Sequence, residues 1–92
     1  MNIDAALEAM LDKRRSQYGL FANLAAVSQG LKEVLIGQDG WHRLSHDQQE
    51  ALEMICHKMA RIVNGDPNHL DSWEDLSGYA TLISEKLKGY PR

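Results

Sequence analysis

The sequence has few of the features that mark several protein classes. With a single cysteine, it can form neither an internal disulfide nor a four-cysteine zinc site. Its apolar stretches are all shorter than the roughly 20 residues that a membrane-spanning helix needs. Its ten basic residues are scattered among thirteen acidic ones and leave a net charge of −3, whereas binding to nucleic acid needs clustered Lys and Arg. We therefore expect no membrane partner and no direct nucleic-acid binding.

The amino-terminal residues also lack the apolar core of a signal peptide, because Asp4, Glu8 and Asp12 interrupt them. We therefore expect a cytoplasmic protein. Cys56 has apolar neighbours in a helical pattern, which predicts a buried and unreactive thiol.

The length of the chain predicts one domain, 1–92, with a thin core. A chain of this size buries only about 60–65% of the surface that it exposes when unfolded. Small domains often gain the missing core by self-association. We therefore expect a homo-oligomer.

Two prolines and seven glycines divide the chain into segments that read as helices, and strand signals are absent. The predicted helices cover about 3–17, 20–36, 46–64 and a stretch from 71 or 72 to about 88. Ser45, with Gln48 three residues later, predicts a capping box for the third helix, and Asp71 or Ser72 would cap the fourth. The fold class is all-α: a four-helix bundle-like domain with a central antiparallel hairpin around Pro67, completed by oligomerisation.

Apolar residues at helical spacing predict the core. They are Ile3, Leu7, Met10 and Leu11 in the first helix; Leu24, Val27, Leu31, Val34 and Leu35 in the second; Leu52, Ile55, Met59, Ile62 and Val63 in the third; and Leu76, Tyr79, Ala80, Ile83 and Leu87 in the fourth. Gly30 is either a weak point of the second helix or a place where another backbone comes close.

A polar stripe accompanies the apolar stripe of the third helix. Its members are Glu50, Glu53, His57, Arg61 and Asn64, with Lys58 at its flank. The fourth helix presents Asp71 and Asp75 one turn apart. If the two helices form an antiparallel hairpin, these polar faces can lie opposite each other.

Clustered carboxylates on facing helices can hold a hard cation such as Mg²⁺. In this interpretation Glu53, Asp71 and Asp75 are the metal ligands. Glu50 and Glu53 are the candidate catalytic carboxylates, which would orient or deprotonate a metal-bound water for attack on phosphorus. Lys58 and Arg61 would contact the phosphate oxygens of a nucleotide.

A structural interpretation of the same residues stays open. Helix faces of mixed charge are common, and Arg61 lies about level with Asp75 across the hairpin, which predicts an ion pair between the helices. Glu53 would then lie ~12 Å from Asp75, at ~1.5 Å per residue. That separation is too large for one metal unless a second chain contributes or the hairpin is curved. Tyr18, Phe21, Trp41, Trp73 and Tyr79 could stack on a base, but such aromatics are more often core or staple residues.

Three stretches together resemble a family of small phage and prophage proteins of unknown function. Residues 15–21 read Arg-x-x-Tyr-Gly-x-Phe, residues 51–67 end in Asn-Gly-Asp-Pro, and residues 71–80 read Asp-Ser-Trp-Glu-Asp-Leu-Ser-Gly-Tyr-Ala. That family in turn is similar to the MazG-type all-α nucleotide pyrophosphohydrolases. The resemblance covers most of the chain.

MazG-type enzymes cleave nucleoside triphosphates with Mg²⁺ held by Glu-x-x-Glu and Glu-x-x-Asp on two helices. Glu50 and Glu53 fit the first element, whereas Asp71 and Asp75 stand at shifted positions in the second. The resemblance implies a nucleotide ligand, a Mg²⁺ cofactor, an oligomer with sites between chains and, for a phage protein, the host cytoplasm. Arg15 joins Lys58 and Arg61 as a candidate phosphate-binding residue. The alternatives are a non-catalytic phage accessory protein with structural signature residues, and a protein that sequesters a nucleotide without cleaving it.

Overall fold

The computed structural model describes residues 4–92 and is all-helical over that range, as predicted. Its elements are α1 (Ala5–Tyr18), α2 (Phe21–Ile36), the 3₁₀-helix η1 (Asp39–Arg43), α3 (His46–Asn64) and α4 (Leu70–Leu87). Ile3, predicted in the first helix, lies outside the described residues. Within residues 4–92, no helix is both long enough and apolar enough to span a membrane.

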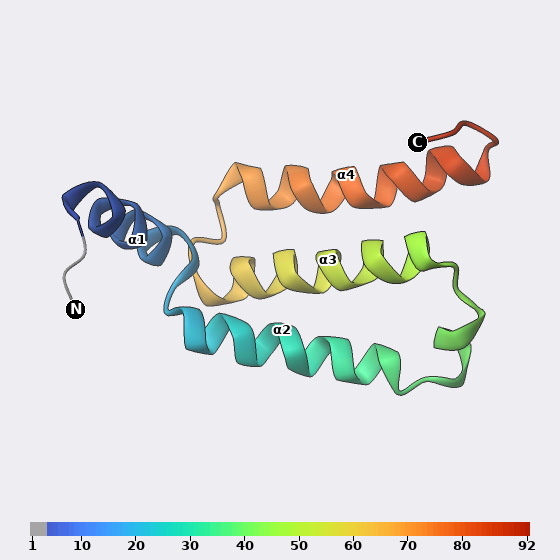
Figure 1. Cartoon of the computed structure of the whole chain (residues 1–92), viewed down its shortest axis with the longest axis horizontal. Coiled ribbons are helices and arrows are strands. Elements are labelled where there is room, and N and C mark those ends of the chain that lie inside the picture. Colours follow the sequence, from blue (N-terminus) through green and yellow to red (C-terminus); the bar gives the residue numbers. More distant parts are fainter. Residues whose placement is uncertain (1–3) are drawn as a thin grey trace.

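The helix α3 lies in the middle of the molecule, with α2 on one side and α4 on the other (Figure 1). Both neighbours run antiparallel to it, so the predicted central hairpin of the third and fourth helices is confirmed. The helix α1 lies at the end of this arrangement, where α2 begins and α3 ends, and makes much less contact with the rest. Three of the four α-helices therefore form a single layer.

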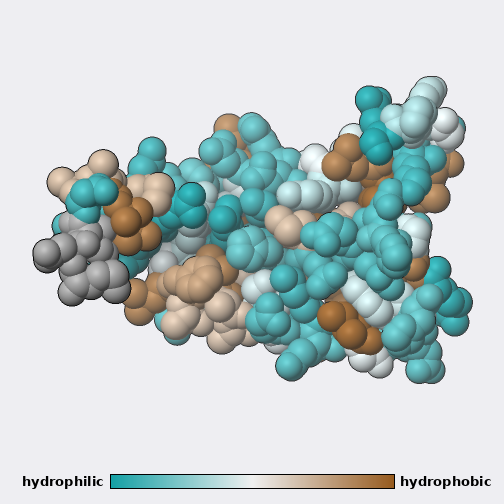
Figure 2. Space-filling model, in the orientation of Figure 1, coloured by the Kyte–Doolittle hydropathy of each residue, from teal (hydrophilic) through white to brown (hydrophobic). Residues whose placement is uncertain are grey.

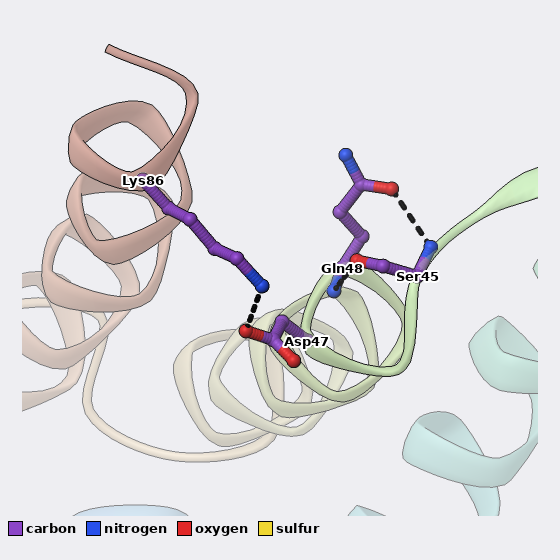
Figure 3. Close-up of polar contacts among 4 residues, drawn as sticks. All are labelled: Ser45, Asp47, Gln48 and Lys86. Atoms are coloured by element: carbon purple, nitrogen blue, oxygen red, sulfur yellow. Dashed lines mark hydrogen bonds and ion pairs between the residues drawn. The ribbon is translucent and has the colours of Figure 1, made fainter. Parts of the chain in front are cut away.

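The start of α3 has the predicted capping box, which Figure 3 shows. The Ser45 hydroxyl accepts from the backbone N–H of Gln48 at 3.2 Å, and the Gln48 side chain accepts from the backbone N–H of Ser45 at 2.9 Å. In the same turn, Asp47 pairs with Lys86 near the end of α4. The Lys86 ammonium lowers the pKa of the Asp47 carboxyl by hydrogen bonding and by charge. This contact ties together the ends of two helices that are far apart in sequence.

The start of α4 differs from its prediction. The helix begins before both predicted caps, after His69, which makes no side-chain capping bond. Asp71 and Ser72 lie inside the first turn instead. The connection is closed from elsewhere, because the Trp73 indole N–H donates to the carbonyl oxygen of Pro67 at 2.8 Å. This bond ties the first turn of α4 to the connection before it, and the start of α4 has no side-chain cap.

The core of the described chain is small. Its buried apolar residues are Leu24, Trp41, Ala51, Cys56, Ala60 and Ile62. Cys56 is buried as predicted, and burial raises the pKa of its thiol. Trp41 is buried in η1, at the end where α2 and α3 are joined, and so belongs to the core. Most of this core lies along α3, because α3 alone has a helix on each side.

Several residues predicted as core are exposed. Val34 is 63% exposed, Val63 is 72% exposed and Leu87 is 73% exposed. In α1 no described residue is buried, although Leu7, Met10 and Leu11 have the predicted helical spacing. The physical reason is the single layer: a helix in it has neighbours at its sides, and an apolar residue on its broad face meets none.

The backbone of the α1–α2 turn comes very close to that of the α3–α4 turn. Gly30, where a close backbone approach was one of the expectations, has nothing within 4 Å of an added Cβ. A Cβ on Gly65 would lie 2.1 Å from the carbonyl oxygen of Gln17, and one on Gly19 would lie 2.2 Å from that of Asn64. Gly19 also has a φ of +79°, in the left-handed region that favours glycine. The two turns interlock because neither glycine carries a side chain.

Hydrogen bonds fix the interlocked turns. The backbone N–H of Asp66 donates to the Gln17 carbonyl at 2.7 Å. The Asn64 side chain donates to the carbonyls of Tyr18 at 2.8 Å and Leu20 at 3.1 Å. These bonds satisfy carbonyls at the end of α1, where the helix itself has no further donors. They therefore hold the carboxyl-terminal end of α1 against the end of α3.

Gly65→Ala should destabilise the protein by at least about 2 kcal/mol, because the added methyl group would press on backbone atoms that cannot move independently. Gly78→Ala in α4 is the matched control, since an added Cβ there meets nothing within 4 Å. It should raise stability by up to about 1 kcal/mol through helix propensity. Urea unfolding of both variants measures the difference, and equal midpoints would show that the turns are not interlocked.

Candidate functional site

A cavity of about 320 Å³ opens where α1 meets α2 and the end of α3. This volume is at the lower end of the range for small-molecule sites, roughly 300–1,000 Å³. The lining residues are Leu11, Arg14, Arg15, Tyr18, Gly19, Phe21, Leu24, His57 and Arg61. Three of the five arginines of the chain therefore share one cavity, and no carboxylate lines it.

Arg61 is held in the cavity by Tyr18. Its guanidinium carbon lies 4.3 Å from the centre of the Tyr18 ring, in cation–π geometry. The Tyr18 ring in turn packs edge-on against His69, with centroids 5.5 Å apart, and its hydroxyl lies 3.4 Å from His69 Nε2. Arg61 Nε is buried and has no hydrogen-bond partner within the described chain. A buried donor without an acceptor lowers stability, and an oxygen atom of a bound ligand would supply the missing acceptor.

His57 lies in the same cavity, one turn before Arg61 on α3. Burial lowers the pKa of its imidazole, and the positive charges of Arg61, Lys58 and Lys32 lower it further. The ring is therefore a neutral donor and acceptor near pH 7. The three cations that contribute to the lowered pKa all lie near the ring.

A second, more open pocket of about 270 Å³ adjoins the first and is lined by Met10, Lys13, Arg14, Gln17, Tyr18 and Arg61. Arg14, Tyr18 and Arg61 line both pockets, so these three side chains form the boundary between them. Lys13 adds a further positive charge. The first pocket is mostly apolar apart from its arginines, while the second is mostly polar.

Of the predicted phosphate-binding residues, Arg15 and Arg61 share the cavity and Lys58 does not. Lys58 is buried, and its ammonium lies 2.9 Å from the Asp75 carboxylate. The interhelical ion pair predicted for Arg61 and Asp75 is thus made by Lys58 instead. This hydrogen bond and the Lys58 charge lower the pKa of Asp75. Arg61 is left available because its side chain stacks on α1 and not on α4.

The predicted metal ligands do not assemble within one chain. Asp75 is engaged by Lys58, and Asp71 is largely exposed, 3.9 Å from His69. Glu53 lies five residues before Lys58, which places it about 140° round α3 and 7–8 Å along its axis from the residue opposite Asp75. Over residues 4–92, no three side chains among His, Cys, Asp and Glu are placed to hold a metal ion.

Glu50, the other predicted catalytic carboxylate, is exposed near the start of α3. It lines a shallow depression with His46, Asp47 and Tyr79, towards the other end of the layer from the arginines. Neither Glu50 nor Glu53 lines the arginine cavity. The acidic and basic halves of the predicted site are therefore separate in the single chain.

Sequence reasoning missed Arg14, the cavity role of His57 and the stack of Arg61 on Tyr18. The signal was present in the first motif, because Arg15, Tyr18 and Phe21 are spaced so that all three reach one cavity. What could not be read from spacing is the fold of α1 back against the end of α3. That fold depends on the contact between two turns 46 residues apart in sequence.

Comparison with known proteins gives a family and no activity. No curated protein and no solved structure matches the chain. A family model described as "Domain of unknown function (DUF6378)" matches residues 2–87, and its description mentions neither MazG-type enzymes nor phages. Since the match covers nearly all of the sequence, the chain belongs to this family of unknown function.

Proposed function

We propose that this protein binds a nucleotide through its phosphate groups in the arginine-lined cavity. The observation that carries the proposal is the convergence of Arg14, Arg15 and Arg61 on a cavity without a carboxylate. Guanidinium groups match phosphate geometry and make charge-assisted hydrogen bonds to it. Among the described residues none of the three is in an ion pair, so their charge is available to a ligand.

The two adjoining pockets suit the two ends of a nucleotide. The larger, mostly apolar pocket has the Tyr18 and Phe21 rings, on which a base can stack. The smaller, more polar pocket adds Lys13, which suits the phosphates. Arg14 and Arg61, which line both pockets, and Arg15, which lines the larger one beside them, would then contact the phosphate next to the sugar, and Lys13 the outer phosphates.

The resemblance to MazG-type enzymes extends this proposal to Mg²⁺-dependent cleavage of a nucleoside triphosphate. In one chain, Glu53, Asp71 and Asp75 do not fit a Mg²⁺ site, and we derive no reaction step through the metal. Binding without cleavage is what the single chain supports best. Cleavage with Glu50 and Glu53 would require carboxylates from a second chain. An origin in a phage, and hence action in a host cytoplasm, belongs to the same resemblance.

A non-catalytic accessory protein is the second candidate, because several motif residues have structural roles. Gly19, Asn64 and Gly65 hold the two turns together, and Asp75 pairs with Lys58. These roles account for parts of all three motifs without any ligand. They leave Arg15 and Arg61 unexplained, and for that reason nucleotide binding is the function we favour.

Isothermal titration calorimetry with nucleoside mono-, di- and triphosphates, each with and without Mg²⁺, tests the proposal. Affinity should rise with the number of phosphates and fall with added salt. Arg61→Ala should weaken binding roughly 10- to 100-fold, the equivalent of losing one charge-assisted bond of about 1.5–3 kcal/mol. Arg61→Lys should recover only part, because it keeps the charge without the planar group.

Arg43→Ala is the matched control, since Arg43 lies in η1 and does not line the cavity. It should bind like the unaltered protein. An absence of heat with every nucleotide at millimolar concentration, or equal losses for Arg43→Ala and Arg61→Ala, would count against the site. Pyrophosphate release with Mg²⁺, measured in parallel, would separate cleavage from binding alone.

The imidazole of His57 should report the ligand by NMR titration. In the free protein its pKa should lie below the ordinary value of about 6.5, because burial and three nearby cations disfavour the protonated ring. A bound phosphate adds negative charge and should raise that pKa. Binding then takes up a proton between the free and bound pKa values, so this site favours binding as pH falls through that window. An unchanged His57 titration at saturating ligand would contradict the assignment, with the His42 signal as internal reference.

A further inference from the structure

Each helix of the layer carries an apolar stripe that nothing in the described chain covers. Its exposed members include Leu20, at the N-cap of α2, and Val34 on α2; Met59 and Val63 on α3; and Trp73 and Leu87 on α4. Their exposed fractions run from 36% to 73%. The two residues on α2 and the two on α4 are both 14 positions apart, and those on α3 are four apart, so each pair lies along one side of its helix.

The stripes of α3 and α4 lie on the same side of the layer. Leu52 and Ile55 of α3 line one apolar groove of about 300 Å³ with Ala80 and Ile83 of α4. These four positions belong to the stripes that the sequence predicted as core. The groove is therefore continuous with the exposed residues on both helices.

This apolar side is opposite the arginine cavity. Met59 and Val63 each stand two residues from Arg61, which places them about 160° round α3 from it at 3.6 residues per turn. On α2, Phe21 lines the cavity, and Leu20 and Val34 lie on the far side of the buried Leu24 from it. Figure 2 shows a side of the layer on which hydrophilic residues dominate along the middle. The apolar stripes thus lie on the side of the layer away from the arginine cavity.

A stable domain normally has two packed layers around one core. Three helices of 16 to 19 residues, spaced 8–10 Å apart at ~1.5 Å per residue, present a side of roughly 600–700 Å² in projection. That is close to the ~800 Å² that each partner buries in a stable protein–protein interface. The exposed side is therefore large enough to need, and to support, a second layer.

We propose that a second copy of this chain covers the apolar side, giving a dimer with two layers of three helices each. None of the exposed stripe residues is charged, so two identical sides can meet without burying an unpaired charge. Tryptophan and methionine in the stripe suit an interface core. The proposal does not rest on nucleotide binding, because the arginine cavity stays open on the outer side of such a dimer.

Sedimentation velocity at micromolar concentration, with far-UV circular dichroism, tests the proposal. The unaltered protein should sediment as a dimer, at twice the 10.4 kDa of one chain. Val63→Glu and Val34→Glu should each give a helical monomer, since both positions are largely exposed in the single chain and tolerate a charge there. Leu82→Glu is the matched control, because Leu82 is an exposed apolar residue of α4 that lies beside Tyr79 and Glu50, on the polar side. This variant should stay dimeric.

A monomeric unaltered protein would overturn the proposal and leave the apolar side to a different protein. A Leu82→Glu variant that dissociates while Val63→Glu and Val34→Glu remain dimeric would also overturn it, by placing the interface on the polar side. Nucleotide binding is measured separately, and its loss or retention does not change either outcome.

Discussion

The contact between the α1–α2 turn and the α3–α4 turn is the constraint on which the site depends. Without it, α1 would have little to hold it, because no described residue of α1 is buried. Gly19 and Gly65 let the two backbones meet, and Asn64 fixes them by donating to two carbonyls. The contact brings Arg14, Arg15 and Tyr18 to the end of α3, where Arg61 lies. The contact between the two turns therefore brings the arginine side chains of α1 and α3 together around one cavity.

Much of the fold could be predicted, because it follows from local rules. Helix periodicity, the capping box at Ser45 and the glycine and proline stops each act within a few residues. The start of α4 was missed because the helix begins after His69 without a side-chain cap, so the capping residues Asp71 and Ser72 did not mark its boundary. The extent of the core was also misjudged. Spacing identifies apolar faces correctly, but it cannot say whether a second layer is present to cover them.

The candidate site was half predicted. Arg15 and Arg61 were predicted to bind phosphate, and they share the cavity. The prediction paired Arg61 with Asp75, whereas in the structure Lys58 pairs with Asp75. Helix register places both residues near Asp75, and only the position of α1 decides which one turns away. Arg61 stacks on Tyr18, which leaves Lys58 to neutralise Asp75. As a result, Arg61 is free to contact a ligand, and the Asp75 carboxylate is occupied by Lys58 and is not available to a metal ion.

The side-chain Nε–Hε signals of the arginines test most directly whether Arg14, Arg15 and Arg61 bind phosphate. Titration of the labelled protein with a nucleoside triphosphate should shift the signals of Arg14, Arg15 and Arg61 and leave that of Arg43 in place. Equal small shifts of all arginine signals would indicate only general attraction of a polyanion. An unchanged Arg61 signal at saturating ligand would contradict the account.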